Sequence, residues 1–129
     1  MGVNTLSKSE RLNSKIAIEK LFSGSAKSFS LFPLRVVFMQ TAKKEGAAGA
    51  SLLISVPKKR FKRAVKRNRI KRQIREAYRN NKHPLLNLLE EKEQNLMIAV
   101  IYLSNELISS AEVEEKLNSL LVRIAEKIA

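Results

Sequence analysis

The apolar residues at the start of the chain recur at helical spacing. Residues 1–10 are polar and are expected to be loose. From about residue 14 to residue 23, Ile18, Leu21 and Phe22 fall on one stripe of a helix. The sequence therefore predicts a short amphipathic helix near the N-terminus.

The next two apolar segments alternate in the manner of β-strands. Residues 29–40 and residues 50–56 both place apolar side chains at every second position. Pro33 cannot donate a hydrogen bond to a β-ladder, so the first strand is either an edge strand or broken at that point. A hairpin that joins the two strands is the simplest topology.

A second helix is expected from about Ala64 to Asn80. Its buried stripe follows helical spacing and consists of Ile70, Ile74, Ala77 and Tyr78. At 100° per residue, the opposite side holds Asn68, Arg72, Arg75 and Arg79, and the two edges hold Arg69 and Lys71. This helix has one core face and one cationic face about three turns long.

The remaining chain predicts a buried strand and a last helix. Residues 83–95 form a polar connection that is partly helical in character, and residues 96–103 are apolar without alternation. A strand of that kind is covered on both faces. Ser109 and Glu112 match a capping box, which starts a helix that runs to the C-terminus.

These elements follow the order α-β-β-α-β-α and predict one α+β domain over residues 1–129, built as a two-layer α/β sandwich. The strand–helix–strand segment within residues 50–103 requires a crossover connection. General rules for such connections favour a right-handed crossover.

The charge is concentrated in one fifth of the chain. The 129 residues carry a formal net charge of +13, and residues 58–82 hold thirteen of the 25 Lys and Arg but only one of the 12 acidic residues. A solvated helix face usually mixes signs, because like charges four residues apart repel. The stretch therefore predicts a polyanionic partner: nucleic acid first, an anionic membrane surface second.

Several classes of protein are disfavoured. The chain has no Cys, so it has no disulfide framework and no thiolate metal site. Its longest apolar run is the eight residues 96–103, far short of a membrane span. The N-terminus lacks the apolar segment of a secretory signal. We expect a cytoplasmic protein with no membrane partner.

The sequence offers no convincing catalytic or metal-binding residues. The single histidine, His83, precedes Pro84 and is expected in a turn. Glu90, Glu91 and Glu93 lie in a polar connection, where surface solubilisation is the simpler role. A metallonuclease needs several converging carboxylates, and the basic stretch contains only one acid.

Nucleic-acid binding uses other side chains. Asn68 lies among basic neighbours, and its amide either bonds a base edge or ribose hydroxyl or caps a turn. Exposed aromatic residues would serve single-stranded recognition, and Phe22 and Phe61 are the best candidates for exposure, although the pattern favours core packing for Phe22.

The segment RNRIKRQIREAY at residues 67–78 resembles the signature helix of the bacterial ribonuclease P protein subunit. Ala64 and Val65 precede it, as in that family. The segment SVPKK at residues 55–59 resembles the strand end and lysine pair that come before the family's helix. The pair Arg11-Leu12 followed by Phe22 resembles the family's opening.

The resemblance implies the protein cofactor of an RNA enzyme that removes the 5′ leader from precursor tRNA. Its partners would be ribonuclease P RNA and precursor tRNA, with no other protein required. The RNA would bind most of the Mg²⁺ and perform the hydrolysis. The residues that match the family's RNA-binding motif are Arg67, Asn68, Arg69, Lys71, Arg72 and Arg75.

The resemblance also implies a cleft for the single-stranded leader, formed by a sheet face and the first helix. Its residues here would be Ile18, Phe22, Lys58 and Lys59. It further implies a left-handed β-α-β crossover, as in the second domain of a ribosomal protein, against the general rule. Two departures affect local contacts: Ile18 stands where the family often has an aromatic residue, and Lys62-Arg63 replaces a common Gly-Asn pair.

Three functions remain open at this stage. A ribonucleoprotein subunit would promote cleavage only together with its RNA. A ribosomal or other general RNA-binding protein would bind many RNAs without preference for a precursor tRNA. A stand-alone nuclease would cleave RNA by itself and would depend on Glu76 or on the Glu90–Glu93 group.

Overall fold

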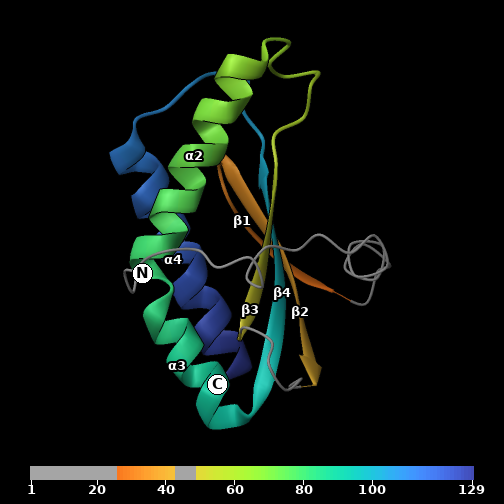
Figure 1. Cartoon of the computed structure of the whole chain (residues 1–129), viewed down its shortest axis with the longest axis vertical. Coiled ribbons are helices and arrows are strands. Elements are labelled where there is room, and N and C mark those ends of the chain that lie inside the picture. Colours follow the sequence, from red (N-terminus) through yellow and green to blue (C-terminus); the bar gives the residue numbers. More distant parts are fainter. Residues whose placement is uncertain (1–25, 43–48) are drawn as a thin grey trace.

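The computed structural model describes residues 26–42 and 49–129 (Figure 1). The elements in this part of the chain are β1 (Lys27–Leu31), β2 (Leu34–Ala42), β3 (Ala50–Ser55), α2 (Ala64–Asn81), α3 (His83–Lys92), β4 (Gln94–Tyr102) and α4 (Ser110–Ile128). The helix expected over residues 14–23 and the loose segment expected over residues 1–10 lie outside the described residues.

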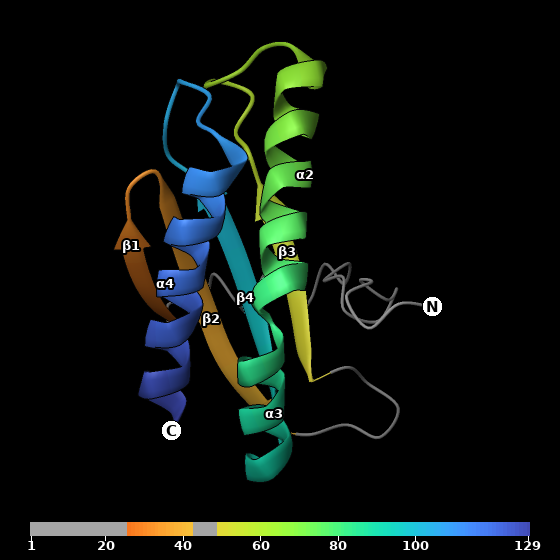
Figure 2. The ribbon, with the colours of Figure 1, turned by 90° about the vertical axis from the view of Figure 1, so that its left-hand side faces the viewer.

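The four strands form one sheet in the order β1-β2-β4-β3. β1 and β4 each run antiparallel to β2, and β3 runs parallel to β4. The helices α2, α3 and α4 all lie on one face of this sheet, as Figures 1 and 2 show from two sides. The expected two-layer α+β sandwich is confirmed.

The strand expected over residues 29–40 is broken at Pro33. β1 and β2 pair antiparallel on either side of Phe32 and Pro33, with Leu31 opposite Leu34. The turn is a position where the missing N–H of proline removes no ladder hydrogen bond. Of the two alternatives for this segment, the broken strand is confirmed.

The hairpin expected between the strands of residues 29–40 and 50–56 is wrong, because β4 lies between β2 and β3. Met97 of β4, for example, pairs with Met39 on one side and Ser51 on the other. The five residues from Leu96 to Val100 are all buried. A strand that is apolar on both faces gains most from the centre of a sheet, which leaves the more polar β3 at an edge.

The connection from β3 through α2 and α3 to β4 joins two neighbouring parallel strands. In Figure 2 the helices lie in front of the sheet, β3 runs upward, and β4 lies to the left of β3. This arrangement is a left-handed crossover. The general expectation of a right-handed connection is wrong here, and the expectation from the resemblance is confirmed.

The core lies between the helices and the sheet. Of the stripe expected on α2, Ile70, Ile74 and Tyr78 have no exposed surface and Ala77 has 3%. The helix expected at the C-terminus is α4, and the Ser109 hydroxyl accepts a hydrogen bond from the Glu112 backbone N–H at 3.2 Å, as the capping pattern predicts.

The connection expected to be partly helical contains α3, which buries Leu85 and Leu89. No helix in the described ranges combines the length and the apolar character that crossing a membrane requires.

The side of the sheet that faces away from the helices forms a separate surface, here named the outer sheet face. Its centre is a small apolar cluster of Val37, Met97 and Ala99. Residues two positions apart on a strand, and residues directly opposite on neighbouring strands, share a face. By this register the outer sheet face also includes Ser28, Ser30, Arg35, Ser51, Ser55 and Ile101.

Substitution of Leu117 by Ala should destabilise the protein strongly, because this α4 side chain is fully buried in the core. The expected loss is about 2–5 kcal/mol in the free energy of unfolding, measured by urea denaturation. Val122→Ala on the same helix is the matched control: Val122 is 49% exposed, so its loss should stay within about 0.5 kcal/mol. Equal losses for the two variants would contradict the placement of α4.

Candidate nucleic-acid interface

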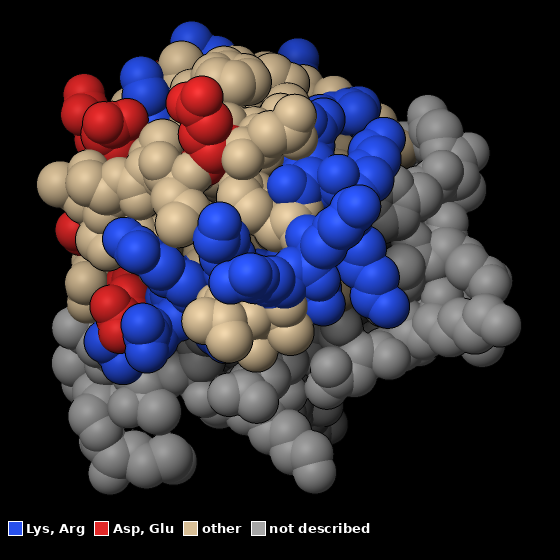
Figure 3. Space-filling view, turned by 90° about the horizontal axis from the view of Figure 1, so that it is seen from above, with Lys and Arg blue, Asp and Glu red and all other residues tan. Residues whose placement is uncertain are grey.

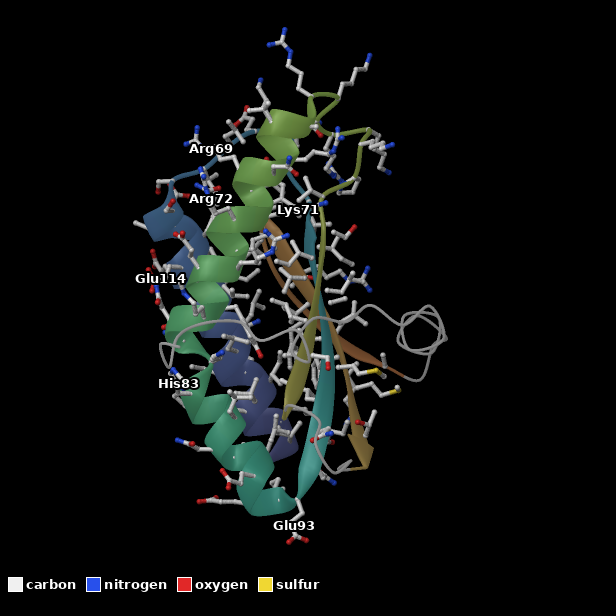
Figure 4. The ribbon with its side chains drawn as sticks, in the orientation of Figure 1. Arg69, Lys71, Arg72, His83, Glu93 and Glu114 are labelled. Atoms are coloured by element: carbon white, nitrogen blue, oxygen red, sulfur yellow. The ribbon has the colours of Figure 1, made fainter. Side chains whose placement is uncertain are left out.

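The helix α2 presents five of the six predicted RNA-binding side chains outside the core. We call this surface the cationic face of α2, and its residues are Asn68, Arg69, Lys71, Arg72 and Arg75. All are exposed except Lys71, which is half-buried. In Figure 4, Arg69 and Arg72 lie on the side of the helix toward the start of α4, whereas Lys71 lies on the opposite side. Arg69 and Lys71 therefore lie on opposite edges of α2, as the helical spacing predicts.

The described residues do not neutralise the positive charge of this surface. Within the described part of the chain, none of the five residues of the cationic face has a hydrogen-bond or ion-pair partner. Arg63, Arg67, Lys71, Arg75 and Arg79 also follow one another at four-residue spacing. Each such like-charge pair costs about 0.2–0.5 kcal/mol on a helix, so the repulsion persists until a polyanion binds.

The N-terminal end of α2 adds to the positive field. Its N-cap residue, Arg63, makes no side-chain capping hydrogen bond, and the first turn holds no acidic residue. The backbone N–H groups and the dipole at a helix N-terminus favour an anion. Figure 3 looks onto this end of the molecule, and its Lys and Arg atoms form a broad band while Glu atoms gather to one side.

One predicted RNA-binding residue, Arg67, is directed inward. Its Nη1 donates to the backbone carbonyl oxygen of Phe61 at 2.7 Å and to that of Lys62 at 2.9 Å. Arg67 is half-buried, unlike its neighbours Asn68 and Arg69. The structure therefore uses this guanidinium to fasten the loop that precedes α2.

The loop of residues 57–63, here named the basic loop, is fixed to the core by Phe61. Only 6% of Phe61 is exposed, and its ring centroid lies 6.0 Å from that of Tyr102. The expectation that Phe61 is exposed is therefore wrong, because the loop folds back over the end of β4. Arg60 strengthens this attachment: its Nη1 donates to Asn105 Oδ1 at 3.2 Å.

The residues predicted to hold the leader are only partly described. Lys58 and Lys59 are exposed in the basic loop, close to the carboxyl end of the edge strand β3. Ile18 and Phe22 lie outside the described residues, so their part in the leader cleft stays a prediction.

Two features of the site went unnoticed in the sequence. Gln73 is 7% exposed, and its Nε2 donates to the Ile108 carbonyl oxygen at 3.1 Å and to Ser110 Oγ at 3.2 Å. This amide ties α2 to the start of α4. The sequence signal for the burial of Gln73 was its position between Ile70 and Ile74, which belong to the buried stripe of α2. The other feature is Phe32, which is 67% exposed in the turn between β1 and β2.

The described residues do not offer a metal centre. They contain no group of three or more His, Cys, Asp or Glu side chains that could hold an ion. Glu90, Glu91 and Glu93 are exposed around the end of α3, and His83 begins that helix. A divalent cation in the reaction would therefore need ligands other than these side chains.

Taken together, the fold and the surface define an α+β protein that presents one cationic helix face. Residues 6–125 match the family model described as Ribonuclease P. The chain belongs to the ribonuclease P protein family.

The sequence relatives agree with this assignment. A "Ribonuclease P protein component" from Porphyromonas gingivalis is 48% identical over 120 residues, which cover 93% of this chain and 86% of the relative. A protein with the same name from Chlorobium phaeobacteroides is 38% identical over 110 residues, covering 80% and 75%. Membership of this family implies a part in a ribonuclease complex that includes RNA and acts in tRNA processing.

Solved structures with the same fold include the ribonuclease P proteins of two bacteria. The Thermotoga maritima protein superposes with a TM-score of 0.68 at 28% identity, covering 88% of this chain and 96% of that one. The Staphylococcus aureus protein gives a TM-score of 0.66 at 22% identity, covering 91% and 95%. At that lower identity the second likeness supports the fold alone.

Substitution of Arg67 by Ala should loosen the basic loop. The Arg60 backbone N–H donates to the Pro57 carbonyl oxygen at 3.1 Å, so its exchange with deuterium reports on the loop. Hydrogen bonds from a charged donor contribute about 1.5–3 kcal/mol each, so the Arg60 amide should exchange at least about tenfold faster. In Arg72→Ala, the matched control, the rate should not change. Unchanged exchange in Arg67→Ala would contradict the fastening role.

Proposed function

We propose that this chain is the protein subunit of ribonuclease P and binds the catalytic RNA through the cationic face of α2. In this role it promotes the Mg²⁺-dependent endonucleolytic removal of the 5′ leader from precursor tRNA, which produces the mature 5′ end. The observation that carries the proposal is the placement of four of the family's signature residues, Asn68, Arg69, Arg72 and Arg75: they stand exposed, with no partner among the described residues, on a helix whose other side is buried.

A rigid helix suits recognition of a folded RNA. The donors of Arg69, Arg72 and Arg75 are held at fixed spacing along about 9 Å of helix. An arginine guanidinium can bind phosphate oxygens through two parallel hydrogen bonds and can also stack on a base. The Asn68 amide can bond a base edge or a ribose 2′-hydroxyl, which would add RNA-specific contacts to the charge attraction.

The proposed chemistry belongs to the RNA subunit. The described side chains provide no converging carboxylates for a metal-dependent hydrolysis, so we assign the Mg²⁺ ions to the RNA. Mg²⁺ supplies charge stabilisation to the phosphodiester as it is cleaved. The protein would contribute by binding the RNA and positioning the substrate in the cytoplasm, with no membrane and no other protein required.

The outer sheet face is the proposed contact for the 5′ leader. Its apolar centre of Val37, Met97 and Ala99 is bordered by serine hydroxyls, which suits the mixed apolar and polar surface of a single strand. Lys58 and Lys59 would attract the leader's phosphates from the neighbouring basic loop. By the resemblance, Ile18 and Phe22 would complete this cleft.

Reconstitution tests the proposal. The full chain is mixed with a bacterial ribonuclease P RNA and a 5′-labelled precursor tRNA at low Mg²⁺, with RNA-only and protein-only controls. We expect leader release only in the complete mixture. RNA binding by the folded protein without stimulation of cleavage would instead indicate a general RNA-binding protein, and cleavage by the protein alone would indicate a nuclease.

The double variant Arg69→Ala/Arg72→Ala should lose affinity for the catalytic RNA by at least about tenfold, because hydrogen bonds from charged donors contribute about 1.5–3 kcal/mol each. Its melting temperature should not fall, since both side chains are exposed and have no partner among residues 26–42 and 49–129. Arg123→Ala, which removes an exposed arginine from α4, is the control and should bind normally. Equal affinities of the double variant and the wild type would rule out the cationic face as the RNA contact.

Salt should weaken the complex steeply. If about six of the thirteen basic groups in residues 58–82 meet phosphates, a plot of log affinity against log salt concentration should have a slope on the order of −4 to −5. Filter binding across a salt series measures this slope. A flat dependence would exclude phosphate contacts as the main source of affinity.

A further inference from the structure

Phe32 is the one exposed aromatic side chain within residues 26–42 and 49–129, with 67% of its surface accessible. A single exposed apolar residue is common on protein surfaces, so exposure alone indicates little. Whether Phe32 has a binding role depends on the residues around it. Sites for single-stranded nucleic acids combine exposed aromatic rings with positive charge.

The turn that carries Phe32 is firmly attached to the sheet. The Leu103 backbone N–H donates to the Pro33 carbonyl oxygen at 2.7 Å, which fastens the turn to the end of β4. Leu31 and Leu34 pair across the turn, and Leu34 is fully buried. Phe32 is therefore an exposed ring on a fixed support, which lowers the entropy cost of stacking a ligand on it.

Two side chains of the same β1–β2 hairpin suit the rest of a nucleotide. Arg35 follows three residues later, is exposed, and has no hydrogen-bond or ion-pair partner in the described part of the chain. Ser30 is directly opposite Arg35 on β1, so its hydroxyl lies on the same outer sheet face. A guanidinium can bind a phosphate, and a serine hydroxyl can bond a ribose.

We propose that Ser30, Phe32 and Arg35 form a site for one unpaired nucleotide of the 5′ leader, named the hairpin nucleotide site. The base stacks on Phe32 and the adjoining phosphate contacts Arg35. This inference rests on the proposed function and extends it, since it assigns a base-stacking residue within the described part of the chain.

The position of this site favours the leader over the catalytic RNA. Figure 2 shows the β1–β2 hairpin and α2 at opposite sides of the molecule, with α4 between them. A catalytic RNA bound to the cationic face of α2 therefore approaches from the other side. Arg35 belongs to the outer sheet face, which is the surface proposed for the leader.

An abasic scan of the leader tests the site. Precursor tRNAs that lack one leader base at a time are bound to the complex reconstituted with wild-type protein or with Phe32→Ala. At one position, loss of the base should weaken wild-type binding about tenfold and should leave Phe32→Ala binding unchanged, because stacking on an aromatic ring is worth roughly that factor per base. Phe32→Tyr should behave as wild type.

The controls separate the possible failures. Phe32→Ala should bind the intact precursor about tenfold more weakly than wild type, yet bind mature tRNA equally well. Val122→Ala, which shortens another exposed apolar side chain, should match wild type with both RNAs. The site is refuted if, at every leader position, loss of the base weakens Phe32→Ala binding as much as it weakens wild-type binding. It is also refuted if Phe32→Ala weakens the binding of precursor and mature tRNA alike. Failure of the proposed function is different: the wild-type protein itself would not stimulate cleavage.

Discussion

The packing of α2 against the core is the interaction on which the interface depends. The helix carries like charges at four-residue spacing that disfavour it by about 0.2–0.5 kcal/mol per pair. Ile70, Ile74 and Tyr78 are fully buried on its other side, and each such side chain stabilises the fold by about 1.5–3 kcal/mol. Burial therefore exceeds the repulsion, and the helix can hold Arg69, Arg72 and Arg75 exposed without a partner among the described residues. The Gln73 amide adds two hydrogen bonds that link α2 to the start of α4.

The two faces of α2 could be predicted because helical spacing is a local property. A period of 3.6 residues separates Ile70 and Ile74 from Arg72 and Arg75 whatever the rest of the chain does. Strand pairing is not local. The alternation in residues 29–40 and 50–56 predicts two strands correctly, but their partners depend on competition with the more apolar β4, which takes the place between them. The left-handed crossover between β3 and β4 could be predicted only from the family resemblance.

The candidate site, like the fold, could be predicted from the sequence only where it depends on local helical spacing. Sequence spacing places Asn68, Arg72 and Arg75 on the side opposite the core, and all three are exposed in the structure. It cannot reveal that Arg67, in the same motif, turns toward the carbonyl oxygens of the basic loop, because that contact depends on the path of residues outside the helix. The prediction of which aromatic side chains are exposed fails for a similar reason. Phe61 packs against Tyr102, whereas Phe32 is exposed in the turn at the strand break.

The central claim is that RNA binds the cationic face of α2 and not the outer face of α4. The chain has no Cys, so Glu76→Cys on α2 and Val122→Cys on α4 each provide a unique attachment point for a tethered iron chelate that cleaves nearby RNA. In the complex with ribonuclease P RNA, the account predicts localised strand cleavage from position 76 and none above background from position 122. Equal cleavage from both positions, or cleavage from position 122 alone, would contradict it.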